Sequence, residues 1–306
     1  MKKKALWTVL AIILIGSFLL VGCSSSGDEN TKAKAEIIEF GVFPQSIKAA
    51  DVTITETIVQ NSLYLGSDGA YYTKVTAKPH KANYTFSDGT VIEESVDYYF
   101  KDEPIKWRVL SKENGTALIL SEKILYSERY YKGDYKIENG NYYIKSGSGA
   151  GKPINSYAYS NIRKYINGDF FYWAFTEEAE FDRIQSNLIT GDNVFLAEEE
   201  DVTSGWYGFN VKNYNEDPAR VKITTDFARA LGAEISTSGD TYGAGIWWLG
   251  SKHTIDKEIA ANLKKNGFSV EAKTEEAAVV TAKGECEGKF VLSQCGVVPA
   301  MKITLS

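Results

Sequence analysis

The amino-acid sequence predicts an α+β protein in which strands dominate. Residues 51–100 are rich in Thr, Tyr and Val, and these residue types favour strands. Strand-like apolar runs return after residue 245. The helical segments between them are few and short, and they do not alternate with strands as the helices of a doubly wound sheet do. The chain of 306 residues is 43% hydrophobic and 24% charged, which excludes wholesale disorder, collagen and coiled coil.

Turn residues and composition predict the strands. The first is Glu36–Gln45, which includes a proline at its end. The clearest hairpin joins residues 105–110 to residues 116–120 through Asn114 and Gly115, because both turn positions tolerate positive φ angles. Strands and hairpins are also expected across residues 51–100, and the chain should close with the runs 246–249, 278–281, 289–292, 296–298 and 301–305.

Three short helices are predicted from their capping residues. Ser160 can cap a helix over residues 161–167, because a serine oxygen accepts a hydrogen bond from a free N–H of the first turn. Thr176 can cap a second helix, whose first turn would hold Glu177 and Glu178. Thr225 can cap a third over residues 226–231.

The N-terminus resembles a bacterial lipoprotein signal. Three lysines precede an apolar run that ends in Leu20-Val21-Gly22-Cys23. The resemblance implies cleavage before Cys23 and a diacylglycerol group on its sulfur. The expected organisation is a signal peptide over residues 1–22, a flexible tether over residues 23–35 and one domain over residues 36–306. An uncleaved membrane helix is the alternative, because eighteen mostly apolar residues are at the lower limit for spanning a bilayer.

The charge balance excludes one class of partner. Removal of residues 1–22 takes away three lysines and no acids, which leaves 31 basic against 40 acidic residues, or −9. Such a surface repels phosphate backbones and anionic headgroups. The sequence therefore predicts no nucleic-acid partner, and attachment to the membrane through the lipid on Cys23, outside the cytoplasm of a bacterial cell envelope.

Two cysteines remain after lipidation. Cys286 and Cys295 form an even pair with eight residues between them, and an oxidising compartment favours a structural disulfide. A metal pair and a redox pair are the alternatives, although no histidine is near and the spacing is not CxxC.

Seven segments, in order, resemble a family of bacterial domains catalogued as DUF6273. They cover nearly all of the chain from about residue 38. The family is similar to the formylglycine-generating-enzyme branch of the C-type-lectin-like fold, which implies a single α+β domain with small antiparallel sheets, few short helices and long loops. The seven segments are residues 40–45, 105–110, 160–167, 192–196, 225–228, 247–249 and 296–300.

Two positions depart from the family pattern. The family usually has arginine where this chain has Gly250, and again where it has Val298. Both changes remove a planar, permanently charged donor. If these arginines share one buried network in the family, this chain has lost that network. A disulfide between Cys286 and Cys295 could then stabilise the domain in its place.

Aromatic residues supply the candidate binding site. Trp206, Tyr207 and Tyr214 lie in a Gly- and Asn-containing segment of a kind that recognition surfaces use. Trp247 and Trp248 are adjacent on an expected strand, so their side chains should point to opposite faces. One of them could be a stacking platform for a ligand. The alternatives are a loop folded on itself and a pair of core tryptophans.

No motif for catalysis or for metal binding is present. The sequence lacks a GxSxG elbow, a phosphate loop and HExxH. Acidic runs at residues 198–201 and 210–217 could suit Ca²⁺, but a solvated acidic loop explains them as well. We therefore expect a non-catalytic envelope protein that binds an extracellular protein or carbohydrate, with no cofactor. The alternatives are an enzyme that uses Cys286 and Cys295 or an acidic pocket, and a structural envelope protein.

Overall fold

The computed structural model describes residues 35–305, apart from residues 59–62, 256, 268–269 and 271–272. Residues Ala35–Ser306 form one compact unit. The predicted signal peptide, Cys23 and the tether up to residue 34 lie outside the described residues. No helix in the described part of the chain is long and apolar enough to cross a membrane.

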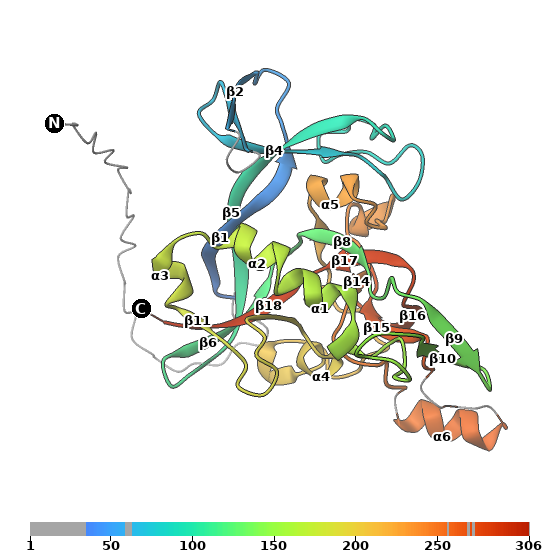
Figure 1. Ribbon diagram of the computed structural model, residues 1–306. Coiled ribbons are helices and arrows are strands. Elements are labelled where there is room, and N and C mark those ends of the chain that lie inside the picture. Colours follow the sequence, from blue (N-terminus) through green and yellow to red (C-terminus); the bar gives the residue numbers. More distant parts are fainter. Residues whose placement is uncertain (1–34, 59–62, 256, 268–269, 271–272, 306) are drawn as a thin grey trace, which may run out of the picture. The chain divides into compact units, whose positions relative to one another are not determined.

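The larger of two main sheets has nine strands among the described residues. Its order is β11-β18-β6-β5-β4-β3-β2, with β1 beside β5 and β12 beside β18 (Figure 1). The strands are β1 (Ile37–Ile47), β2 (Ile54–Ile58), β3 (Leu63–Gly66), β4 (Tyr71–Thr76), β5 (Asp97–Glu113), β6 (Thr116–Ser121), β11 (Ile184–Gln185), β12 (Val194–Leu196) and β18 (Pro299–Thr304).

Strand β5 organises this sheet because its 17 residues are long enough for three partners. Phe100 pairs with β1 on one side and β4 on the other, whereas Trp107 pairs with β1 and β6. The predicted hairpin is confirmed, since Asn114 and Gly115 turn with φ angles of 49° and 76°. The sheet is larger than the small sheets that the resemblance implied. The reason is that β5 begins well before the hairpin, and its first residues, 97–101, pair with β4.

The second sheet has five strands in the order β16-β15-β14-β17-β8. They are β8 (Tyr126–Arg129), β14 (Trp247–Trp248), β15 (Glu276–Val280), β16 (Cys286–Phe290) and β17 (Gln294–Val297). Two further pairs are β7 (Lys123–Ile124) with β13 (Ile223–Thr224), and β9 (Tyr135–Glu138) with β10 (Asn141–Ile144).

This second sheet separates two hydrophobic clusters. Trp248, Val279 and Cys295 face the larger core, whereas Trp247 and Cys286 face the smaller core. The alternation follows from the pleat, which sends successive side chains to opposite faces. The larger core also takes much of the aromatic content of the chain, including Phe40, Phe43, Phe86, Phe100, Trp107, Phe170, Phe171, Phe175 and Phe227.

The helices are short, and two of the predicted caps are confirmed. The Ser160 hydroxyl accepts a hydrogen bond from Arg163 N at 3.1 Å, and the Thr225 hydroxyl accepts from Ala228 N at 3.2 Å. The cap at Thr176 is wrong, because Glu177 caps that helix through a capping box. The helices are α1 (Asn161–Ile166), α2 (Asp169–Ala174), α3 (Glu178–Phe181), α4 (Glu199–Val202), α5 (Asp226–Ala230) and α6 (Lys257–Lys265), with single turns η1 (Tyr157–Tyr159), η2 (Gly205–Tyr207) and η3 (Gly239–Thr241). The α+β class is therefore confirmed.

Candidate functional site

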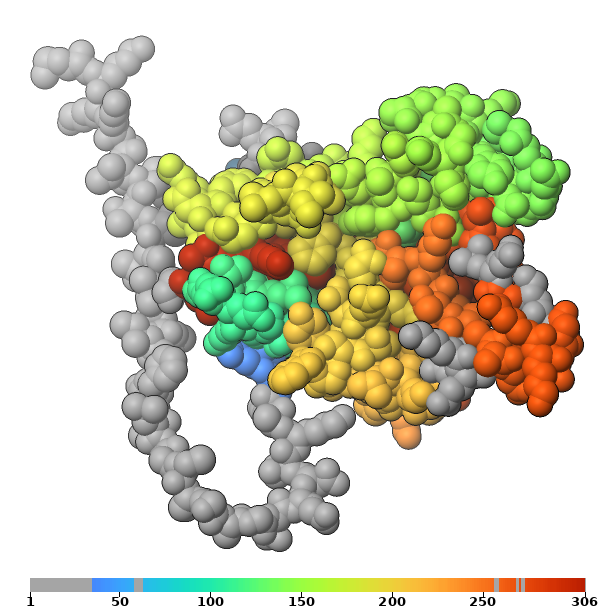
Figure 2. Space-filling view, turned by 90° about the horizontal axis from the view of Figure 1, so that it is seen from below, coloured from blue at the N-terminus to red at the C-terminus, as the bar shows by residue number. Residues whose placement is uncertain are grey.

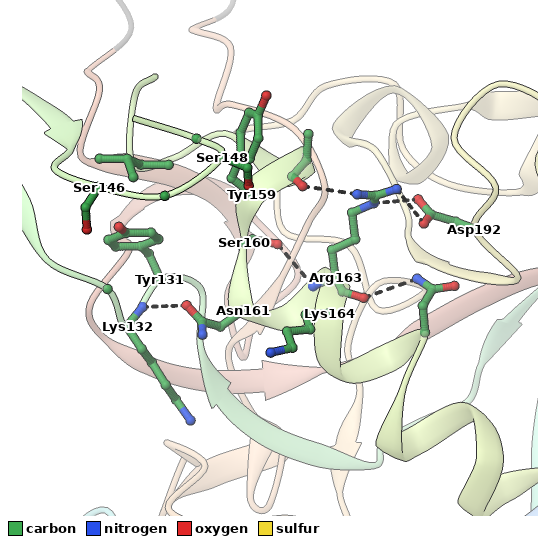
Figure 3. A pocket seen from close by; sticks show the side chains of 16 residues that line it. Tyr131, Lys132, Ser146, Ser148, Tyr159, Ser160, Asn161, Arg163, Lys164 and Asp192 are labelled. Carbon is green, nitrogen blue, oxygen red and sulfur yellow. Dashed lines mark hydrogen bonds and ion pairs between the residues drawn. The ribbon is translucent and has the colours of Figure 1, made fainter. Parts of the chain in front are cut away.

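A cavity of about 660 Å³ opens between three segments of the chain. One wall is the turn after β8, the second is the Gly- and Ser-rich loop after β10, and the third is η1 with α1 (Figure 3). Its volume lies within the ~300–1,000 Å³ that small-molecule sites usually have. The lining residues are Tyr131, Lys132, Gly133, Ile144, Ser146, Gly147, Ser148, Gly149, Ala158, Tyr159, Ser160, Asn161, Arg163, Lys164, Asn167 and Asp192.

One wall of the cavity is fixed by an ion pair. Arg163 donates to both carboxylate oxygens of Asp192 at 2.9 Å, and its guanidinium also donates to the carbonyls of Ala158 and Thr190. The bond to Asp192 raises the pKa of Arg163 above its ordinary value. The Asn167 amide ties α1 to β12 by donating to Val194 O at 2.7 Å. These groups are already engaged and hold the wall in place.

The loop over residues 145–151 approaches the opposite wall closely. A Cβ added to Gly149 would lie 2.9 Å from Tyr159 Cγ and 2.9 Å from Ile144 Cδ1. Only glycine therefore lets the loop come this near to the Tyr159 ring, which is 37% exposed.

Several groups in the cavity have no partner in the protein. Within the described residues, the side chains of Ser146, Ser148, Tyr159 and Lys164 make no hydrogen bond or ion pair. Lys132 is paired with Glu128 at 2.5 Å. Because Arg163 and Lys132 are both neutralised by carboxylates, Lys164 leaves this cavity with a positive charge in a chain whose formal net charge is −6.

The aromatic segment that the sequence singled out forms a second feature, which we call the Trp206 loop (residues 203–217). Trp206 is 96% exposed, Tyr214 is 40% exposed, and Tyr207 is half-buried beside the smaller core. Exposure of a whole indole ring is unusual, because large aromatic side chains normally supply core burial.

A buried arginine holds the Trp206 loop in shape. The Arg220 side chain is fully buried, and its guanidinium donates to backbone carbonyls around the loop. Asp217 neutralises it at 3.6 Å and accepts from Asn210 N at 2.7 Å. The carbonyls bound by Arg220 belong to Val202, Asn210, Lys212, Asn213, Asn215 and Gly284. The loop is therefore built around a satisfied charge.

The tryptophan pair is not a ligand platform. Trp247 and Trp248 are both 0% exposed, so neither can stack on a ligand at the surface. The Trp248 indole donates to Glu128 O at 2.9 Å in the larger core, and the Trp247 indole donates to Arg220 O at 3.2 Å in the smaller core. The prediction of opposite faces is confirmed, but each face is covered.

The predicted disulfide is wrong. Cys286 and Cys295 are both free and buried. Cys286 pairs with Val280, Val280 with Trp247, and Trp247 with Gly296, the neighbour of Cys295. Three strand spacings of ~4.8 Å separate the two cysteines, whereas a disulfide needs Cα atoms within about 7 Å. They also face different cores.

The same burial argues against thiol chemistry. Removal from water raises the pKa of the Cys286 and Cys295 thiols to about 12. A nucleophilic cysteine needs a thiolate near neutral pH. Two protonated thiols on opposite faces of a sheet do not form a reactive pair.

The acidic runs serve local structure. Glu198 and Asp201 form the capping box of α4, and burial raises the pKa of both carboxyl groups. Glu199 accepts from Asn213 Nδ2 at 2.6 Å and lies 3.1 Å from His253 Nδ1. Among the described residues, no group of three His, Cys, Asp or Glu side chains is arranged to hold a metal ion.

Gly250 and Val298 are both closely surrounded by other residues. A Cβ on Gly250 would lie 3.0 Å from a Glu198 carboxylate oxygen and 3.1 Å from Leu196 O. Val298 is completely buried in the smaller core. With no disulfide present, the suggestion that a bridge replaces lost arginines is wrong as well.

The cavity was missed by sequence reasoning. A signal existed in the run Ser146-Gly147-Ser148-Gly149, which is too rich in glycine to be regular structure. That run gives no indication of its partner, because Tyr159 and Lys164 reach it through the packing of α1. Comparison with protein-family models found no match, and neither a search of curated proteins nor one of solved structures returned a match.

Proposed function

We propose that this chain is a lipid-anchored protein of the bacterial cell envelope that binds a polar, hydroxyl-rich ligand, a saccharide, without transforming it. The observation that carries the proposal is the cavity beside α1, in which unpartnered hydroxyl and ammonium groups lie next to a tyrosine ring. Saccharides are held by hydrogen bonds to such groups, together with stacking of a sugar face on an aromatic ring. The Leu20-Val21-Gly22-Cys23 sequence supports the anchor.

We also propose the C-type-lectin-like fold and the DUF6273 family for residues 36–306. The support is the order of the seven resembling segments together with the α+β class. On this view the ligand site lies at the cavity and not at the tryptophan pair, because Trp247 and Trp248 are closed off from solvent.

Binding of a saccharide panel to the purified full chain tests the function. Titration calorimetry should detect at least one saccharide, and Tyr159→Ala and Lys164→Ala should each weaken it tenfold or more. Matched controls are Tyr172→Ala, which removes a 68% exposed tyrosine outside the cavity, and Lys81→Ala, which removes an exposed lysine. Gly149→Ala should also weaken binding, because the new methyl group would push against Tyr159. If the cavity variants and the controls bind equally well, the ligand is held elsewhere and the proposal fails.

A further inference from the structure

One surface combines an exposed tryptophan with the strand at which the described chain begins. Trp206 is 96% exposed. Val211, which is 66% exposed, lies beside the preceding residue, since a Cβ on Gly205 would be 3.4 Å from Val211 Cγ1. Tyr214, which is 40% exposed, adds a second aromatic ring on the same loop. The buried Arg220 binds the backbone carbonyls of this loop, and these side chains lie on its outer side.

The Trp206 loop is linked to the start of the described chain through β5. Glu36 O accepts from Val109 N at 2.9 Å, and the neighbouring Arg108 donates to Ala219 O, just beyond the loop, at 3.0 Å. Leu110 shares the smaller core with Phe209 of the loop. In Figure 2 the segment around residues 200–215, the β5–β6 turn and the start of β1 lie on one face.

The chain length upstream fixes how far this face can move from an anchored lipid. Cys23 and Glu36 are 36 − 23 = 13 residues apart, and a chain of that length spans at most about 45 Å even when fully extended. A lipid on Cys23 would therefore confine Glu36 to within about 45 Å of the bilayer surface, which raises the effective concentration of the domain at that surface.

The chemistry of the loop suits a lipid surface better than a protein. Tryptophan and tyrosine favour the headgroup level of a bilayer, where the ring meets the acyl chains and the polar atom meets water. Three side chains cannot supply the roughly 800 Å² per partner of a standard protein interface. For a protein already anchored, a small additional contact is enough to set its orientation.

We propose that the Trp206 loop docks on the surface of the membrane to which the chain is anchored, with Trp206 inserted at the headgroup level. The inference rests on the lipid anchor of the proposed function. Because the formal net charge of the mature chain is −9, binding would come from the aromatic side chains and not from attraction to anionic lipids. Docking would also hold the domain in one orientation relative to the bilayer.

Quenching of tryptophan fluorescence by brominated lipids tests the contact of the Trp206 loop with the membrane, with the lipidated full chain as the sample. The protein is reconstituted into phosphatidylcholine vesicles with or without brominated acyl chains, and vesicle flotation measures the anchor separately. Trp206 should dominate the long-wavelength emission, because Trp107, Trp247 and Trp248 are fully buried. Brominated vesicles should quench this emission in the wild type and in Trp173→Phe, and the quenching should disappear in Trp206→Phe.

The outcomes separate the two proposals. Protein that fails to float overturns the anchor. Protein that floats but shows equal emission with and without bromine retains the anchor and overturns the docking. Acrylamide quenching in solution reports whether water can reach Trp206. If this quenching falls as the protein concentration rises, and brominated lipids do not quench the emission, a second copy of the chain covers the loop. That result also overturns the docking.

Discussion

The Trp247–Trp248 pair and the Trp206 loop both looked like aromatic recognition segments, but they have opposite environments. The pair lies in β14, flanked by β15 and β17, and alternation buries one indole in each core. The Trp206 loop contains no strand; it is held by the buried guanidinium of Arg220 and by the hydrogen bond from Cys286 N to Asn213 O at 2.7 Å. A strand between two cores leaves no aromatic face exposed, whereas a polar hub can hold an aromatic side chain in solvent.

Truncation of the two kinds of tryptophan should give the largest contrast. Trp248→Ala should lower the free energy of unfolding by about 3–5 kcal/mol, because it leaves a cavity in the larger core. Trp206→Ala should change it by less than about 0.5 kcal/mol, as expected for an exposed side chain. Urea denaturation followed by circular dichroism measures both, and equal losses would contradict the difference in environment.

Removal of the hub should be nearly as damaging as removal of a core tryptophan. Arg220→Met leaves the buried Asp217 carboxylate without its counter-charge and several buried carbonyls without their donor, which should cost at least about 3 kcal/mol of unfolding free energy. The matched control is Arg129→Met at an exposed arginine, which should change the free energy of unfolding by less than about 0.5 kcal/mol. Hydrogen exchange at residues 203–217 should rise only in Arg220→Met. Unchanged exchange there would show that the loop does not depend on Arg220.

Lys222 is a second buried cation on the same segment, and its replacement should not destabilise the protein at neutral pH as the replacement of Arg220 does. Lys222 has Glu122 at 3.2 Å, and burial lowers its pKa from 10.5 to about 8. Between pH 8 and 10.5 the unfolded chain then binds more protons than the folded one, so this residue makes stability rise with pH.

The change Lys222→Met tests this behaviour. At pH 7 the variant should be as stable as the wild type or more stable. Relative to the variant, the wild type should gain roughly 3 kcal/mol of unfolding free energy from pH 8 to pH 10.5. Denaturation curves of both proteins across this range provide the measurement. Parallel pH profiles would show that Lys222 is charged throughout.

Reduction should have the smallest effect. With the cysteines three strands apart, dithiothreitol should leave the melting temperature unchanged. The native protein should react slowly with a thiol reagent because both thiols are buried, and the unfolded protein should release the thiols of Cys286 and Cys295 without reductant. A melting temperature that falls on reduction would contradict the sheet order.

Local patterns predicted more of the fold than of the site. The Asn114-Gly115 turn and the Ser160 and Thr225 caps could be predicted because each depends on a few neighbouring residues. The pairing of β14 between β15 and β17 depends on segments tens of residues apart. That pairing could not be predicted from the sequence, and it is what buries both tryptophans and separates the two cysteines.

The candidate site was hidden for the same reason. Lys164 and Ser146 line one cavity only because α1 packs beside the loop after β10. Aromatic composition pointed to recognition, but many of these rings fill the larger core. Exposure of Trp206 depends on Arg220, whose role as a hub follows from six carbonyls that no linear motif specifies.

The strand separation of the two cysteines has a consequence for biogenesis. In the unfolded chain Cys286 and Cys295 are nine positions apart, a spacing at which thiols meet within about 100 ns. Oxidation at that stage would staple β16 to β17 and prevent β14 and β15 from inserting between them. If the chain is exported to an oxidising compartment as proposed, sheet assembly must bury both sulfurs before an oxidant reaches them.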